Sequence, residues 1–126
     1  MTENEISYQI RGAIYDVYNS LGPGLLENVY EAALIVELRD HRNLNVKQQE
    51  PMDVYYKGTK LNVDYRLDLI VEDKVIIELK SVEEMKKVFF LQLKTYLKIA
   101  DKRLGILVNF NCEDINSNIW RIVNNI

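Results

Sequence analysis

Cysteine is almost absent from this chain, since Cys112 is the only one among 126 residues. A lone thiol excludes an intramolecular disulfide framework and a zinc site built on several cysteines, because both need more than one thiol at fixed spacing. We therefore expect a protein of a reducing compartment, the cytoplasm. The length predicts a single domain over residues 1–126, large enough to be stable by burial of apolar side chains alone.

Long apolar runs and an excess of positive charge are also missing. The longest stretch without a charged residue, residues 17–26, is far shorter than the roughly 20 apolar residues of a membrane-spanning helix. The first residues include two glutamates and no apolar segment, unlike a signal peptide, so we expect no membrane association. With 16 Lys and Arg against 19 Asp and Glu, the formal net charge of -3 argues against nucleic-acid binding through bulk positive charge.

What the chain does contain is a clear succession of helical patterns. Thr2 and Glu5 have the spacing of a capping box, and the apolar residues that follow recur every three to four positions, which predicts a first helix ending near Gly22. A second helix is expected over residues 25–40, and it is so apolar that we expect neighbours on more than one side. A third helix is predicted over residues 82–100.

Between the second and third predicted helices the apolar period becomes that of strands. We expect strands at residues 46–50, 53–56, 60–64, 65–71 and 74–80, separated by Pro51 and by turns at residues 57–59 and 72–73. Residues 103–110 fit a buried strand parallel to its predecessor, and residues 118–123 fit a last strand or a short helix. This order predicts an α/β fold with a mixed central β-sheet flanked by α-helices.

Two of these strands carry charged side chains among apolar ones. Because side chains alternate along a strand, Asp68, Glu78 and Lys80 are expected on one face. The apolar residues expected to share the other face of the first strand are Leu67, Leu69 and Val71. If the turn centres on Asp73, Asp68 stands opposite Glu78 with their Cβ atoms about 5 Å apart. Such close carboxylates repel each other unless a cation compensates, and Mg²⁺ prefers oxygen ligands of this kind.

Each candidate residue also has a purely structural interpretation. Either strand carboxylate could simply pair with a neighbouring cation, Lys80 or Arg66. Gln92 and Tyr96 lie four residues apart on one helical face, which fits either a functional site or a core tyrosine with a polar neighbour. Glu27 stands near the start of an apolar helix, where a carboxylate stabilises the helix dipole without any further role.

Aromatic and basic residues outside this region leave further alternatives open. Trp120 and the Tyr55–Tyr56 pair could stack on nucleic-acid bases, although packing in the core or in a dimer fits them better. His41 is expected at the surface, at the end of the second helix. A group of basic residues fits either a solvated helix face or a rim that contacts phosphates, namely Lys86, Lys87, Lys94, Lys98, Lys102 and Arg103.

An ordered series of motifs runs through most of the chain. Its members are Gly24, Glu27 and Tyr30 in a G-x-x-E-x-x-Y pattern, then Asp68, then Glu78-x-Lys80, then Gln92-x-x-x-Tyr96. In this order and over residues 5–110 the chain resembles the GxxExxY family, which is grouped with the PD-(D/E)XK nuclease superfamily. The order of the motifs is much more specific than any one of them.

The resemblance implies a restriction-endonuclease-like mixed sheet flanked by helices. It also implies a Mg²⁺-dependent nuclease, with Mn²⁺ able to substitute, that hydrolyses phosphodiester bonds in DNA or RNA through a metal-activated water. Because a fold alone does not establish activity, the alternative is a non-catalytic module that keeps the nuclease fold and binds nucleic acid or protein. A homodimer is compatible with either function.

The same resemblance assigns roles to individual residues. Asp68 and Glu78 would hold the metal ion together with the Leu79 carbonyl. Lys80 would position or activate the attacking water and neutralise charge in the transition state. Glu27 would complete the site as an outer ligand or as a ligand of a second metal ion. The pair Gln92 and Tyr96 resembles the extra motif of RecB-type nucleases, which orients the site and contacts the nucleic-acid backbone.

Overall fold

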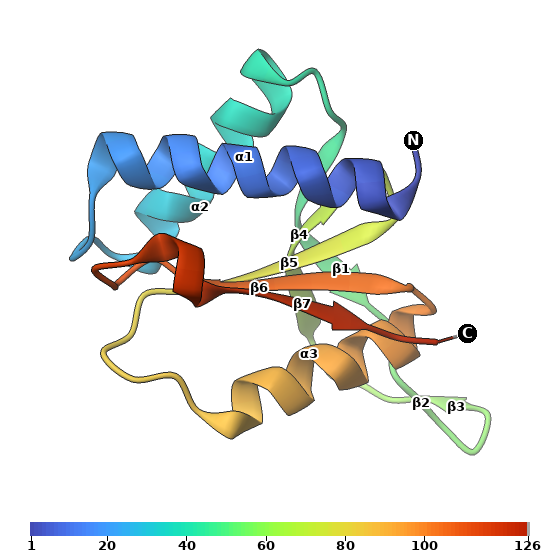
Figure 1. Cartoon of the computed structure of the whole chain (residues 1–126). Helices are drawn as coiled ribbons and strands as arrows, with labels where there is room; N and C mark the ends of the chain where they lie inside the picture. The colour runs from blue at the N-terminus through green and yellow to red at the C-terminus, as the bar shows by residue number, and fades with distance from the viewer. Residues whose placement is uncertain (126) are drawn as a thin grey trace.

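A five-stranded mixed sheet forms the centre of the protein, with helices on both faces (Figure 1). The computed structural model describes residues 1–125. The strand order is β1-β4-β5-β6-β7, formed by β1 (Val46–Met52), β4 (Tyr65–Val71), β5 (Val75–Lys80), β6 (Leu104–Asn109) and β7 (Ile119–Val123). β5 and β6 are parallel, whereas the other neighbours are antiparallel. The predicted α/β fold with a mixed sheet is therefore confirmed.

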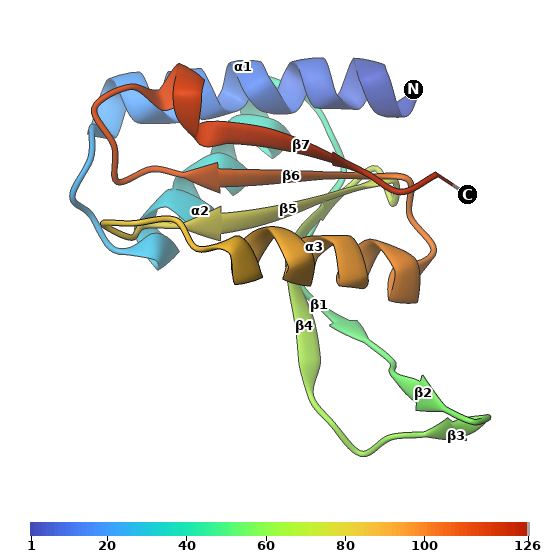
Figure 2. The same cartoon turned by 60° about the horizontal axis from the view of Figure 1, so that its bottom comes forward.

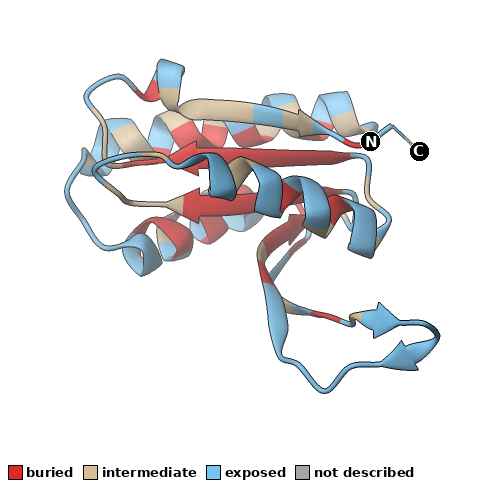
Figure 3. Ribbon diagram, turned by 90° about the horizontal axis from the view of Figure 1, so that it is seen from below, coloured by how far each residue is buried: buried red, intermediate tan, exposed pale blue. Residues whose placement is uncertain are grey.

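Three helices divide the apolar side chains into two cores. α1 (Glu3–Leu21) and α2 (Glu27–Val36) cover one face of the sheet, and α3 (Lys87–Ala100) covers the other (Figure 1). The larger core joins α1 and α2 to the sheet, and the smaller one packs Leu93 and Leu97 of α3 against the opposite face. Both faces of the central strands are therefore buried, as Figure 3 shows for β5 and β6.

The first helix forms as its sequence predicts. The Thr2 side chain accepts a hydrogen bond from the Glu5 backbone N–H, and the Glu5 carboxylate accepts one from the Thr2 N–H, both at 3.2 Å. The helix ends at Leu21, and Gly22 follows with a φ of 70°, a left-handed conformation that glycine adopts most easily.

The second helix differs from its prediction in extent and in environment. α2 begins at Glu27 rather than residue 25, and after Val36 it continues as a π-helical turn, η1 (Glu37–His41). α2 contacts both α1 and β5, as expected, but its outer side is not covered. Val29 and Val36 are 40% and 49% exposed, because α2 lies in the outer layer and buries one stripe only.

The strand predictions are wrong on both sides of residues 55–60. Pro51 lies inside β1 rather than before a new strand, which is possible because β1 is an edge strand. β2 (Tyr55–Tyr56) and β3 (Thr59–Lys60) pair only with each other, and residues 61–64 form no strand. The resulting hairpin projects from the body of the protein (Figure 2).

The third helix begins at Lys87, five residues later than predicted. Val82 is held outside the helix by Asn109, whose side-chain amide accepts from the Val82 N–H at 3.1 Å and donates to its carbonyl at 3.0 Å. At the other end of the chain a short 3-10 turn, η2 (Ile115–Asn118), precedes β7. The expected last strand is therefore present.

The aromatic and histidine predictions have mixed outcomes. Trp120 is half-buried and meets the ring of Phe90 edge-on, with centroids 5.1 Å apart, so core packing is correct for this residue. Tyr55 and Tyr56 are exposed, so core packing is wrong for this pair. His41 lies at the surface, as expected. Within residues 1–125, no helix has the length and apolar character needed to cross a bilayer.

Candidate active site

The backbone pairing between β4 and β5 ends before Asp68 and Glu78, where side-chain hydrogen bonds replace it. The register centres on Asp73, as predicted, because Leu69 pairs with Ile77 and the carboxylates come next on each strand. The Asp68 N–H donates to Glu78 Oε2 at 3.1 Å, and the Leu79 N–H donates to Asp68 Oδ2 at 3.0 Å. Each carboxylate is thus fixed by a backbone N–H of the opposite strand.

The other neighbour of Asp68, strand β1, is also irregular at this level. Gln48 pairs with Leu69 and Glu50 pairs with Leu67, but the intervening Gln49 has a φ of 50° and is left out of the pairing. Leu67 packs in the core under α3, whereas Leu69 and Val71 pack in the core under α1 and α2. The prediction that Leu67, Leu69 and Val71 share one face of the sheet is therefore wrong, because the strands depart from regular geometry around Asp68.

Glu78 is a buried carboxylate without a cationic partner. Glu78 is only 8% exposed. Burial raises the pKa of the Glu78 carboxyl to about 9, and the hydrogen bond and charge of Asp68 act in the same direction. Among residues 1–125, no ion pair includes Asp68, Glu78 or Lys80, and Arg66 pairs with Asp64 instead. The alternative of a structural ion pair is not formed.

Lys80 lies beside the carboxylates but contacts an aromatic ring. Its Nζ atom is 4.5 Å from the centroid of Phe89, near the start of α3, which is within the range of a cation–π interaction. The charge of Lys80 still favours ionisation of Glu78, although burial has the larger effect on that pKa. Phe89 thus holds the ammonium group near the acids without pairing it to either.

Helix α2 brings two further acids towards the site, and one of them has no counterpart in the motif series. Glu27 is exposed in the first turn of α2. Its pKa is raised, most by partial desolvation and next by the negative charge of Asp68. Glu31, one turn later, is 9% exposed and accepts a hydrogen bond from Gln49 Nε2 at 2.9 Å. Burial raises its pKa as well. The spacing of four residues between the two glutamates is the signal that could have identified Glu31.

The donor set suits a divalent cation of the magnesium type. Within residues 1–125, no three acidic, histidine or cysteine side chains lie close enough together to form one metal-binding group. Two carboxylates fixed side by side, with the Leu79 carbonyl next along β5, still provide oxygen ligands. Mg²⁺ commonly takes one or two protein carboxylates and completes its octahedron with water. The residues present therefore fit such an ion.

Helix α3 contributes the last two predicted residues. Tyr96 is half-buried, and its ring meets that of Tyr65 edge-on at 5.9 Å between centroids. Burial and then the charge of Glu78 raise the pKa of Tyr96 to about 12, so its phenol stays neutral. Gln92, one turn earlier, is exposed, and its side chain forms no hydrogen bond with the described residues 1–125.

Comparisons with known proteins agree with this fold. A model of the PD-(D/E)XK nuclease superfamily matches residues 4–122. The crystal structure of SSO0001 has a similar fold, with a TM-score of 0.59, 20% identity and coverage of 79% of this chain and 50% of that one. The chain thus spans about half the length of SSO0001. A comparison with curated proteins found no match. Because the family model covers nearly all of its length, the chain belongs to the PD-(D/E)XK nuclease superfamily.

Proposed function

We propose that the protein is a divalent-metal-dependent nuclease that hydrolyses phosphodiester bonds in DNA or RNA. The observation that carries the proposal is the reciprocal locking of Asp68 and Glu78 by backbone N–H groups at 3.1 and 3.0 Å. This arrangement leaves the buried carboxyl group of Glu78 beside that of Asp68, and no cation among residues 1–125 forms an ion pair with either of them. Membership of a nuclease superfamily supports the same conclusion.

The proposed metal ligands are Asp68, Glu78 and the Leu79 carbonyl. A divalent cation bound there would lower the pKa of a coordinated water and offset negative charge on the phosphate. Glu27, in the first turn of α2, would complete the site as an outer ligand or as a ligand of a second metal ion. We propose Mg²⁺ as the physiological ion and Mn²⁺ as a substitute.

The remaining residues act on the substrate. The ammonium group of Lys80, held over Phe89, supplies positive charge to the phosphate as negative charge develops on it. The neutral phenol of Tyr96 is a hydrogen-bond donor close to Glu78. Gln92 presents its amide from the exposed part of α3, where it can donate to a phosphate oxygen.

Several finer assignments are part of this proposal. We propose that the chain is a member of the GxxExxY family within the superfamily, because Gly24, Glu27 and Tyr30 match its motif. We propose that residues 1–126 form one nuclease-like domain and that the protein acts in the cytoplasm, since one cysteine suits a reducing compartment. A homodimer stays a prediction.

The test is a cleavage assay with supercoiled plasmid, single-stranded DNA and RNA in Mg²⁺ or Mn²⁺. We expect cleavage by the wild type and a loss of about 100-fold or more in Lys80→Ala and Asp68→Asn, as for other groups that stabilise transition-state charge. Lys74→Ala, which changes an exposed lysine in the turn between β4 and β5, is the control and should retain activity. Identical trace cleavage by all four proteins would indicate contamination and overturn the proposal.

A measurement of binding affinity on the same proteins and substrates, beside the cleavage assay, distinguishes the alternative function. A protein that binds nucleic acid with an affinity independent of Mg²⁺, and cleaves none of the three substrates, would be a non-catalytic binding module. In that case Asp68→Asn should bind as the wild type does.

A further inference from the structure

The β2–β3 hairpin exposes two adjacent tyrosines on a projecting arm. Tyr55 and Tyr56 are each 61% exposed, and no residue from Tyr55 to Arg66 is buried. Figures 2 and 3 show the hairpin standing away from the sheet as an exposed ribbon. Packing within the fold therefore does not explain two aromatic side chains at this position, because neither enters a core.

The charge of the hairpin differs from that of the chain as a whole. Residues 54–63 contain Lys57 and Lys60 and no acidic residue, although the protein has a formal net charge of -3. The Nζ atom of Lys57 lies 5.4 Å from the centroid of the Tyr56 ring. Lys60 pairs with Asp53 at the base of the hairpin, at 3.3 Å, so Lys57 is the cation at the turn. Aromatic rings beside a cation are the chemistry that binds single-stranded nucleic acid.

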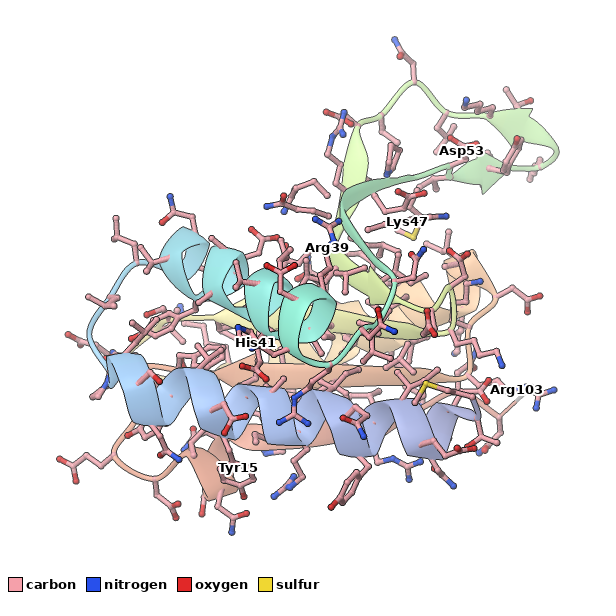
Figure 4. The ribbon with its side chains drawn as sticks, turned by 90° about the horizontal axis from the view of Figure 1, so that it is seen from above. Tyr15, Arg39, His41, Lys47, Asp53 and Arg103 are labelled. Atoms are coloured by element: carbon pink, nitrogen blue, oxygen red, sulfur yellow. The ribbon has the colours of Figure 1, made fainter. Side chains whose placement is uncertain are left out.

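Strand β4 connects this hairpin directly to the proposed active site. Tyr65, its first residue, contacts Tyr96 edge-on, and Arg66 lies two residues before Asp68. The guanidinium of Arg66 also donates to the Gln49 carbonyl at 3.3 Å, opposite Asp68. In the view of Figure 4, Asp53 at the hairpin base and Tyr15 on α1 lie on opposite sides of the molecule. Along the chain, the hairpin leads into the strand that carries Asp68.

We propose that the β2–β3 hairpin binds an unpaired segment of nucleic acid, with bases stacked on Tyr55 and Tyr56 and a phosphate held by Lys57. This inference rests on the proposed nuclease function and adds the class of substrate, a strand with unpaired bases. Base pairs in a continuous duplex have no free face for a tyrosine ring, whereas unpaired bases do. The strand would run from the hairpin along β4 towards Asp68 and Glu78.

Fluorescence anisotropy with a labelled single strand of about ten nucleotides, a length within the usual range of such sites, tests the proposal. Binding is measured without divalent metal, so that no strand is cleaved. We expect Tyr55→Ala/Tyr56→Ala to weaken binding by roughly 5- to 100-fold, the loss of one stacked base or more. Lys57→Glu should weaken binding and reduce its salt dependence. The exposed side chains suggest that both variants fold normally, which circular dichroism checks.

Tyr8→Ala is the matched control, because Tyr8 is 76% exposed on α1 and should not affect binding. Equal binding of the single strand by the wild type and the hairpin variants would overturn the proposal, as would equal wild-type affinity for a duplex of the same length. Size-exclusion chromatography detects the other overturning result, a dimer that the hairpin variants lose, which would make the tyrosines a contact between two copies.

Hydrolysis of bis(p-nitrophenyl) phosphate with Mn²⁺ separates this inference from the nuclease proposal. This small diester reaches the active site without contacting the hairpin, so the hairpin variants should hydrolyse it at the wild-type rate. Hydrolysis of the diester without binding of the single strand would overturn the hairpin proposal alone. Tyrosine-dependent binding without hydrolysis of any diester would support the hairpin and overturn the nuclease.

Discussion

Among individual residues, Glu78 links the stability of the protein to pH. Its pKa is raised from 4.5 to about 9 by burial and by Asp68, so between these values the folded state binds more protons than the unfolded state. The contribution of Glu78 to the stability of the metal-free protein should therefore be greatest below pH 4.5 and should be lost as the pH rises towards 9. Urea unfolding across this pH range measures the slope.

The control variants for this prediction differ in one glutamate each. Glu78→Gln should remove most of the decline, whereas Glu84→Gln, at an exposed position, should retain it. Saturating Mg²⁺ should also flatten the slope, since a metal ion binds the ionised carboxylate. A decline of equal steepness in Glu78→Gln would mean that another group controls the pH dependence.

Glu31 and Gln49 allow a second prediction at the same level. Their hydrogen bond of 2.9 Å joins α2 to β1 opposite Asp68, so we expect it to position Glu27 relative to the strand carboxylates. Glu31→Ala should lower kcat more than it raises KM. The exchange Glu31→Gln/Gln49→Glu retains a donor and an acceptor and should restore much of the activity. An unchanged kcat in Glu31→Ala, which cannot accept the hydrogen bond from Gln49, would contradict a positioning role.

The sequence was informative for some of these residues and not for others. The opposition of Asp68 and Glu78 could be predicted because a turn centred on Asp73 fixes the register of two adjacent strands. The contact between Lys80 and Phe89 could not, because it depends on how α3 docks on the sheet. Gln49 was missed for a similar reason, since its left-handed backbone interrupts an otherwise regular strand pattern.

Among the secondary-structure elements, the segment before α3 depends on a single amide. The Asn109 side chain makes two hydrogen bonds to the Val82 backbone, accepts a third from the Asn111 N–H at 3.2 Å, and is only 3% exposed. Asn109→Ala leaves the part-buried N–H and carbonyl of Val82 without these partners, which should cost about 1–3 kcal/mol. Chemical denaturation measures the loss. Asn125→Ala, at an exposed position, is the control, and an equal effect in both variants would contradict the assignment.

Helix and strand predictions succeeded where a periodic pattern and a clear end signal coincided. α1 has both, with a capping box at Thr2 and a glycine after Leu21. The parallel pairing of β5 and β6 followed from two apolar strands separated by a helix, because such a connection returns the chain in the same direction. The start of α3 was misplaced because Val82 is held outside the helix by hydrogen bonds with Asn109, which no local pattern shows.

For the protein taken as one body, metal binding changes both charge and stability. The formal charge of -3 becomes -1 with one divalent cation, by addition of two charges, which reduces repulsion of a polyanionic substrate. We expect Mn²⁺ at about 100 times its Kd to stabilise the fold by about 2.7 kcal/mol through mass action. Thermal denaturation with increasing Mn²⁺ measures this effect. Glu78→Ala should abolish it, and an unchanged shift in that variant would place the ion elsewhere.

Trp120 gives the protein an intrinsic fluorescent reporter. It is the only tryptophan of the chain, it lies on β7, and its ring rests edge-on against Phe90 in the first turn of α3. Phe89, the adjacent residue, is the one that holds Lys80. A displacement of the start of α3 when metal or substrate binds would therefore alter the emission of Trp120, and the engagement of the active site could be followed in real time without an attached label.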